Sequence, residues 1–155
     1  MFWRMVKTLV FTIVVPGTVG GYVPQTLKGH GGRLPVLFVW IGISLILCGA
    51  AIYLWCAWDF AVKGLGTPAP IDAPRVLVVN GLYRFTRNPM YLGVFSAIEG
   101  QALYYHAMHI AVYGCIMLAI AYVFVVLYEE PHLRKRFGAQ YEGYCRRVPR
   151  WLVRR

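Results

Sequence analysis

The sequence predicts an all-α protein that spans the membrane about four times and ends in an amphipathic helix at the membrane interface. The chain is too apolar for a soluble domain: 59% of its 155 residues are hydrophobic and 14% are charged, whereas soluble domains average about 45–50% and about 25%. It also has two uncharged apolar stretches, each longer than the roughly 20 residues that cross a bilayer. We expect residues 1–155 to form one membrane-embedded domain.

The first expected span covers residues 5–23. Lys7 stands near its start, where a lysine side chain reaches the polar interface, and Pro16 with several glycines should kink the helix. A cleaved signal peptide is the alternative, but its basic start and its small-residue cleavage pattern are both weak here. The second expected span is residues 34–58, which contain no Asp, Glu, Lys or Arg.

The third expected span, residues 90–105, is short. Its helix would extend about 24 Å, less than the roughly 30 Å of hydrocarbon, and it contains Glu99. The fourth span, residues 107–128, follows a break around His106, so the two should form a tight hairpin whose short arm is shielded by its neighbours. Gly93, Ala97 and Gly100 give the short arm a small-residue face, which lets helices approach closely.

A cytoplasmic loop, residues 59–89, is expected between the second and third spans. Its Gly- and Pro-rich part, residues 63–75, should not be helical, and it lacks the Lys-Ser/Thr pair of a phosphate-binding P-loop. With four spans, all but two of the 16 Lys and Arg residues lie on the side of this loop and of both termini. The positive-inside rule places that side in the cytoplasm. The net charge of +10 then indicates anionic lipid head groups as a partner, with no need for nucleic acid.

The C-terminal segment, residues 129–155, is expected on the same cytoplasmic side. Pro131 suits the first turn of a new helix. Apolar and aromatic side chains then recur every three or four residues, as is typical of a helix lying in the membrane interface: Leu133, Phe137, Tyr141 and Tyr144. Taken alone, this pattern favours an anchor over a catalytic role.

Polar residues that suit chemistry gather in two places. Arg84, Arg87 and Asn88 precede a helix start, whose free N–H groups attract a carboxylate or phosphate. Glu129 and Glu130 end the last span and suit an ammonium group. Each group also has a simpler interpretation, since the arginines would hold lipid phosphates and the glutamates would cap the next helix. The four cysteines lack the spacing of a zinc site, so we expect no metal.

Two ordered motifs carry a family resemblance. The first is Gly81-x-Tyr83-x-x-x-Arg87-Asn88-Pro89-x-Tyr91-x-Gly93, and the second runs from Glu129-Glu130-Pro131 to Val148-Pro149-Arg150-Trp151. Together they resemble the isoprenylcysteine carboxyl methyltransferase and phospholipid methyltransferase superfamily, over about half of the chain. Asn88 stands where many members have histidine.

The resemblance implies S-adenosylmethionine as the cofactor, bound on the cytoplasmic side by the last spans and the C-terminal segment. It assigns cofactor binding to Tyr83, Arg87, Asn88, Pro89, Tyr91, Gly93, Glu129 and Glu130. Glu130 and Arg136 resemble a glutamate and an arginine that flank the acceptor in carboxyl-methylating relatives, so they are the catalytic candidates. The chemistry agrees, because the cofactor carboxylate suits an arginine, its ammonium suits a glutamate, and its sulfonium and adenine suit aromatic faces.

The expected function is methyl transfer from S-adenosylmethionine to a lipophilic acceptor that enters sideways from the bilayer. A phospholipid amine, an isoprenylcysteine-like carboxylate and a thiol are all open as acceptors, and an amine would need a base such as Glu130 or His132. Because methyl transfer is an in-line displacement, the protein mainly positions the acceptor and excludes water. The alternatives are a non-enzymatic membrane anchor or assembly protein and, less favoured, a membrane oxidoreductase similar to the sterol reductases.

Overall fold

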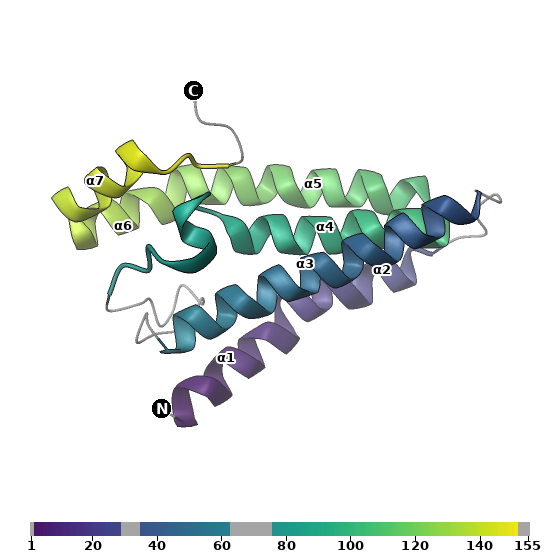
Figure 1. The fold of residues 1–155 in the computed structure, drawn as a ribbon, viewed down its shortest axis with the longest axis horizontal. Helices are drawn as coiled ribbons and strands as arrows, with labels where there is room; N and C mark the ends of the chain where they lie inside the picture. Colours follow the sequence, from purple (N-terminus) through teal and green to yellow (C-terminus); the bar gives the residue numbers. More distant parts are fainter. Residues whose placement is uncertain (1, 29–34, 63–75, 152–155) are drawn as a thin grey trace.

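The computed structural model describes residues 2–28, 35–62 and 76–151, and these residues form helices and connecting turns without a strand (Figure 1). The elements are α1 (Phe2–Val14), η1 (Thr18–Tyr22), α2 (Val23–Thr26), α3 (Val36–Val62), η3 (Gly81–Arg84), α4 (Pro89–Tyr105), α5 (Met108–Phe124), η4 (Val125–Glu129), α6 (Glu130–Phe137) and α7 (Ala139–Arg147). The predicted loop over 59–89 is shorter than expected, because α3 continues to Val62 and residues Gly81–Arg84 form the short helix η3. Its Gly- and Pro-rich part, residues 63–75, lies outside the described residues, as does Arg33.

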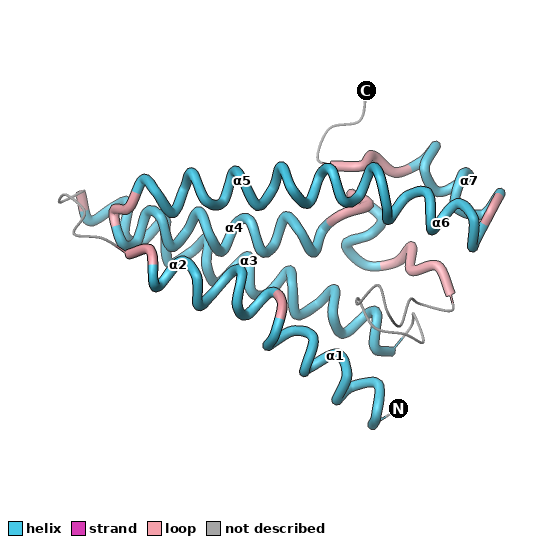
Figure 2. The backbone as a smooth tube through the Cα atoms, turned by 180° about the vertical axis from the view of Figure 1, so that it is seen from behind, coloured by secondary structure: helices cyan, strands magenta, loops and turns pink. Residues whose placement is uncertain are grey.

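The first predicted span is a broken helix, as its proline and glycines indicate. α1 ends at Val14, a turn at Val15 follows, and the chain continues through the π-helical turn η1 into α2. Figure 2 shows this break, and it shows α1 leaning away from the other helices. The kink predicted for this segment is therefore confirmed.

The second half of this segment is held by side chains from other helices. Pro24 has no N–H, so it leaves carbonyl groups of the preceding turn without their backbone donor. The Gln101 side chain donates to the Gly20 carbonyl at 2.6 Å, and the Tyr113 hydroxyl donates to the Val19 carbonyl at 2.9 Å. Polar side chains from α4 and α5 thus satisfy backbone groups that the proline leaves without a backbone donor.

α3 and α4 pack against each other through glycines. A Cβ atom on Gly93 would lie 2.8 Å from the Gly49 carbonyl oxygen, and one on Gly100 would lie 2.6 Å from the Gly42 carbonyl oxygen. Any larger residue would push the two backbones apart. The predicted small-residue face of the third span is therefore confirmed, and it faces α3.

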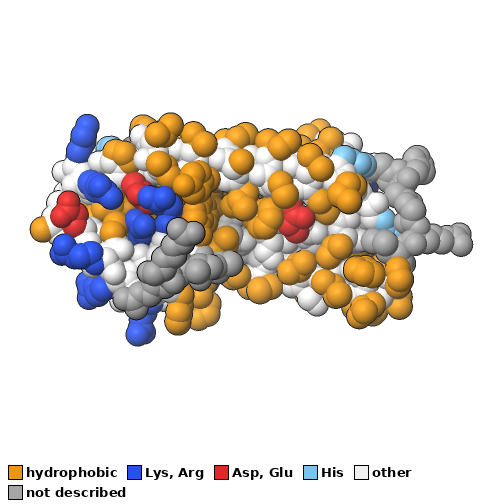
Figure 3. Space-filling model, turned by 90° about the horizontal axis from the view of Figure 1, so that it is seen from above, with side chains coloured by type: hydrophobic (Ala, Val, Ile, Leu, Met, Phe, Trp, Pro, Cys, Tyr) orange, Lys and Arg blue, Asp and Glu red, His pale blue; other side chains and the backbone are white. Residues whose placement is uncertain are grey.

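Two helical stretches are long and apolar enough to cross a membrane, Val36–Phe60 and Met108–Phe137. Only 17% of the apolar window in each is buried inside the protein. Figure 3 shows the apolar side chains along the molecule and the Lys and Arg side chains gathered at one end. α4 has 17 residues, about 25 Å of helix, and it runs between α3 and α5 as the shielded short arm that the sequence predicts (Figure 1).

The helical hairpin predicted around His106 is confirmed. His106 adopts the left-handed conformation with φ 54°, and α5 begins two residues later at Met108. This turn lies at the opposite end of the molecule from α6, α7 and the start of α1 (Figure 1). The N-terminal helix therefore begins at the same end as the C-terminal helices.

Pro131 lies in the first turn of α6, as the sequence predicts, but α6 does not start as a separate helix. α5 continues through the π-helical turn η4 into α6, and the helix ends only at Gly138, where φ is +50°. A proline ring clashes with the carbonyl four residues earlier, and a widened turn relieves that clash. In the described chain both π-helical turns end two residues before a proline, Pro24 or Pro131.

The predicted interfacial stripe packs against the protein itself. Tyr141 and Tyr144 of α7 are buried in one cluster with Leu77 and Val148, and Leu133 and Phe137 of α6 pack on that cluster. The Tyr144 hydroxyl also donates to the Tyr83 carbonyl at 2.8 Å. α6 and α7 are therefore fixed over the segment that leads into α4, and their aromatic stripe is not a free membrane-facing surface.

Candidate active site

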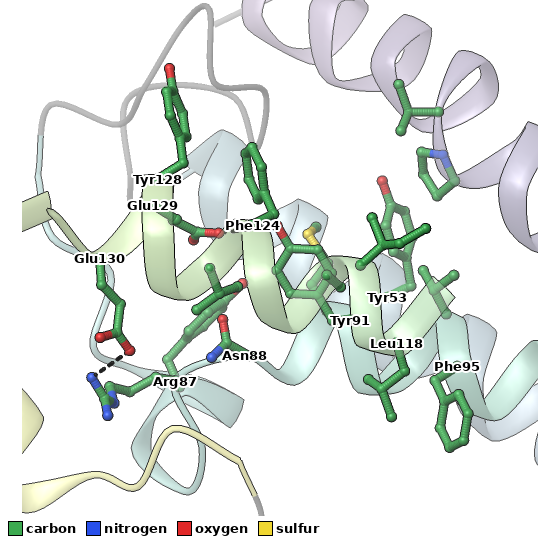
Figure 4. Close-up of a pocket in the computed structure, with 18 of the residues that line it drawn as sticks. Tyr53, Arg87, Asn88, Tyr91, Phe95, Leu118, Phe124, Tyr128, Glu129 and Glu130 are labelled. Atoms are coloured by element: carbon green, nitrogen blue, oxygen red, sulfur yellow. Dashed lines mark hydrogen bonds and ion pairs between the residues drawn. The ribbon is translucent and has the colours of Figure 1, made fainter. Parts of the chain in front are cut away.

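A cavity of about 570 Å³ lies among α1, η1, α3, α4 and α5 and extends to the end of the molecule that carries α6. Its walls are mostly apolar, and its polar groups gather at this end (Figure 4). Six of the predicted site residues line it: Tyr83, Arg87, Asn88, Tyr91, Glu129 and Glu130. His132, the alternative base, also lines it.

Two arginines hold Glu130. Arg87 Nη1 donates to Glu130 Oε1 at 3.0 Å, while Arg150 Nε donates to Oε1 at 2.6 Å and Arg150 Nη2 to Oε2 at 3.0 Å. Only 7% of the Glu130 side chain is exposed. The hydrogen bond to Glu130 raises the pKa of Arg150. Both oxygens of this carboxylate are thus occupied by charged donors, the strongest kind of hydrogen bond.

Glu129, the next residue, has a different environment. The Tyr91 hydroxyl donates to Glu129 Oε2 at 3.0 Å, and in the described part of the chain no arginine pairs with this carboxylate. Figure 4 shows Glu129 pointing toward Tyr91 and Phe124, whereas Glu130 points toward Arg87. One neutral hydrogen bond leaves Glu129 free to accept another donor from the cavity.

The segment after α7 lies against the residues that precede α4. The Arg87 backbone N–H donates to the Pro149 carbonyl at 2.9 Å. The Asn88 side-chain amide and the Thr86 hydroxyl both donate to the Arg150 carbonyl, at 2.9 Å and 3.1 Å. These three bonds hold Arg150 beside the cavity, and they occupy one of the two N–H donors of the Asn88 side chain, which was predicted to meet the cofactor.

Two buried donors at this end have no hydrogen-bond partner among the described residues: Arg87 Nε and Trp151 Nε1. Arg87 Nη1 also donates to Cys145 Sγ at 2.9 Å. Buried donors normally have a partner, and Arg87 lines the cavity, so its unfilled Nε indicates a ligand with an acceptor atom there.

Aromatic rings surround the polar end. The Tyr91 and Trp151 rings meet edge to face with centroids 6.5 Å apart, and Trp151 stacks with Tyr122 at 6.3 Å. The Arg150 guanidinium lies 5.9 Å from the centre of the Tyr122 ring. Burial raises the pKa of the Tyr83 hydroxyl, so this wall of the cavity stays neutral. Tyr91, Phe124 and Tyr128 line the cavity here, and such aromatic faces suit a flat ring or a cationic group.

Three predicted site residues do not line the cavity. Gly93 faces α3, and Pro89 is the first residue of α4, where it shapes the helix start. Arg136 is exposed on α6, with its guanidinium 5.9 Å from the centre of the Phe137 ring. The structure does not bring it to Glu130, because residues six apart on a helix point about 120° away from each other.

Sequence reasoning did not assign Arg150, Trp151 and Cys145 to the site. The one available signal was that Arg150 and Trp151 end the second motif. It also did not predict that the broken first helix lines the cavity, through Phe11, Val15, Pro16 and Val19.

Comparison with known proteins gives one match. A family model described as phospholipid methyltransferase matches residues 37–140. The matched region runs from α3 to the start of α7 and includes Arg87, Glu129 and Glu130. No curated protein and no solved structure matches the chain.

Proposed function

Because the chain belongs to the phospholipid methyltransferase family, we propose that it transfers a methyl group from S-adenosylmethionine to the head-group amine of a phospholipid. Proteins of this family are integral membrane enzymes that use S-adenosylmethionine, and they belong to the superfamily that the two sequence motifs resemble. The predicted enzyme class and cofactor are thereby confirmed. The family assignment also argues against the anchor and the reductase-like alternatives.

The observation that supports a lipid acceptor is the shape and chemistry of the cavity. It joins a charged end, at Arg87 and Glu129, to an apolar arm lined by α1, η1, α4 and α5. Val15 and Ile120 line this arm although they are 45% and 55% exposed, so the arm reaches the apolar outer surface. A phospholipid has the same division, with a charged head group and apolar chains. We infer that it enters sideways from the bilayer.

The residues at the charged end fit the cofactor. Its carboxylate suits the unfilled Arg87 Nε, and the ring of Trp151, which meets the Tyr91 ring edge to face, suits the adenine. When bound, S-adenosylmethionine supplies a methyl group on a positively charged sulfur. The protein's own contribution is to align the acceptor with that methyl group and to exclude water.

Glu129 is the residue best placed to take a proton from the acceptor. A head-group amine is protonated near neutral pH and must lose a proton before its lone pair can attack. Tyr91 orients the Glu129 carboxylate, which lines the cavity and keeps acceptor capacity. Glu130 is less available to the acceptor, because two arginines already occupy both of its oxygens. We therefore assign the base role to Glu129 rather than to Glu130.

We also propose four membrane crossings, with α1–α2 and α4 crossing beside the two longer helices, and both termini in the cytoplasm. Fourteen of the 16 basic residues would then lie on the cytoplasmic side. The soluble methyl donor would meet the membrane-borne acceptor at the end of the molecule where Lys and Arg gather (Figure 3).

The test is a titration of the detergent-purified protein with S-adenosylhomocysteine, followed by transfer of labelled methyl into phosphatidylethanolamine vesicles. We expect binding, and we expect Glu129→Gln to lower transfer by about a hundredfold, because a positioned base contributes about 10²–10⁴. Glu142→Gln, an exposed carboxylate of α7, is the matched control. A folded protein that does not bind S-adenosylhomocysteine would contradict the proposed function, and labelling of only an isoprenylcysteine analogue would contradict the proposed acceptor.

A further inference from the structure

Arg150 ends the second motif but lies beyond residues 37–140, which the family model matches, and the resemblance assigns it no role. The structure nevertheless places it in the site. Its guanidinium donates two hydrogen bonds to Glu130, and its carbonyl receives two from the residues before α4. It is the only cation beside Arg87 that pairs with a carboxylate of the cavity in the described chain.

The neighbouring glutamates create the need for such a residue. Two adjacent carboxylates at one end of a cavity repel each other and compete for the same cationic ligand. Arg87 alone would have to balance Glu130 and also offer a donor to the cofactor. With Arg150 bound at two points, Glu130 is fully engaged, and Arg87 Nε remains unfilled.

We propose that Arg150 is a positioning residue for methyl transfer. It holds Glu130 in its ion pairs, so that Glu129 alone binds the head-group amine of the acceptor. This inference rests on the proposed function. It makes the C-terminal segment part of the enzyme: the hydrogen bonds from Thr86, Arg87 and Asn88 bring Arg150 to a carboxylate 20 residues earlier in the chain.

A purely structural role would give a different result. If Arg150 only fastened the C-terminal segment, its loss would lower stability or the amount of folded enzyme, and kcat per folded molecule would not change. If it acts through Glu130, its loss lowers kcat, and the loss disappears when Glu130 is neutral. A double-mutant cycle separates the two cases.

The experiment measures kcat and KM for Arg150→Gln, Glu130→Gln and the double variant, with the concentration of folded enzyme taken from S-adenosylhomocysteine binding. We expect Arg150→Gln to lower kcat at least tenfold, since a displaced catalytic group costs up to about 10²-fold. In the Glu130→Gln background the same change should cost less than twofold. Arg147→Gln is the control, because Arg147 is exposed and, among the described residues, its side chain donates to the Gly143 carbonyl of its own helix.

Two outcomes overturn the inference while leaving the proposed function intact: a kcat for Arg150→Gln equal to that of the control, or losses that multiply in the double variant. Should Arg150→Gln not fold, Arg150→Lys keeps the charge but not the two-point contact, and a kcat equal to the control's overturns the inference in the same way. Failure of the proposed function is distinct, because the unmodified enzyme would then transfer no methyl group.

Discussion

Glu129 and Glu130 are neighbours in sequence, yet the structure gives them different contacts. Glu130 is saturated by Arg87 and Arg150, whereas Glu129 has one neutral hydrogen bond, from Tyr91. The sequence predicts both as cofactor ligands, because a pair of carboxylates is all that it shows. Which of the two can still bind a ligand depends on the partners that folding brings to each.

Arg87 provides the sharpest test at this scale. Its Nη1 donates to Glu130 and Cys145, while its Nε has no partner among the described residues and can donate to a ligand. In Arg87→Lys a single ammonium group replaces the forked guanidinium. It cannot keep the contacts to Glu130 and Cys145 and also offer a donor to the cofactor. We expect S-adenosylhomocysteine to bind about tenfold more weakly, since one hydrogen bond to a charged group contributes about 1.5–3 kcal/mol.

Calorimetric titration measures this change. Arg84→Lys is the matched control, because Arg84 is exposed at the end of η3 and does not line the cavity. Equal affinity of Arg87→Lys and the unmodified protein would show that Arg87 does not contact the cofactor.

At the scale of elements, prolines and glycines shape the helices that build the cavity. The π-helical turns η1 and η4 each end two residues before a proline, and both carry residues that line the cavity: Val19 in η1 and Val125, Tyr128 and Glu129 in η4. A widened turn changes the direction in which the following side chains point. The turn at η4 therefore helps to decide where Glu129 and Glu130 are aimed.

The glycine contact between α3 and α4 predicts a stability change. In Gly93→Ala the new methyl group would lie 2.8 Å from the Gly49 carbonyl oxygen and 3.1 Å from the Tyr53 backbone nitrogen. Because both are backbone atoms, the helices must separate, and we expect a loss of about 1–3 kcal/mol in the free energy of unfolding.

Thermal unfolding in detergent measures this loss. Gly143→Ala in α7 is the control: its Cβ would meet no atom within 4 Å, so it should be neutral or gain about 0.5–1 kcal/mol from helix propensity. If Gly93→Ala is as stable as Gly143→Ala, the close approach of α3 and α4 is not what the structure describes.

At the scale of the whole molecule, the cavity joins two environments. Its apolar arm reaches the exposed apolar surface at Val15 and Ile120, and its charged end lies where the C-terminal helices and the basic residues gather (Figures 3 and 4). This arrangement suits a reaction between a water-soluble donor and a membrane lipid, because each reactant arrives from its own phase.

The proposed membrane orientation is testable with compartment-specific reporters. We expect a reporter fused to either terminus to report the cytoplasm, and one inserted between α2 and α3 to report the opposite side. The reason is that, with four crossings, most basic residues lie on the same side of the membrane as the termini. Termini in different compartments would contradict four crossings.

Much of the fold is predictable from local sequence. Residues 34–58 and 107–128 are apolar runs of spanning length, and the structure has helices there. The hairpin at His106 and the small-residue face of α4 also follow from local pattern. The prediction of a single C-terminal amphipathic helix was wrong, because the structure has two helices, α6 and α7, separated at Gly138. The aromatic period continues past Gly138 and therefore does not reveal this turn of the backbone. The spacing of apolar residues along a helix also does not show whether they contact lipid or another part of the protein, here the segment around Leu77.

By itself the sequence determined the all-α class, the apolar runs and, through two ordered motifs, the methyltransferase family, because these depend on residue type and spacing along the chain. Only the tertiary structure decided that Arg150, not Arg136, meets Glu130, and that the broken first helix lines the cavity. Such contacts join residues from separate helices, and an ion pair leaves no periodic trace in the sequence. The physical reason is that packing α6 and the C-terminal segment onto the start of α4 determines which charges meet.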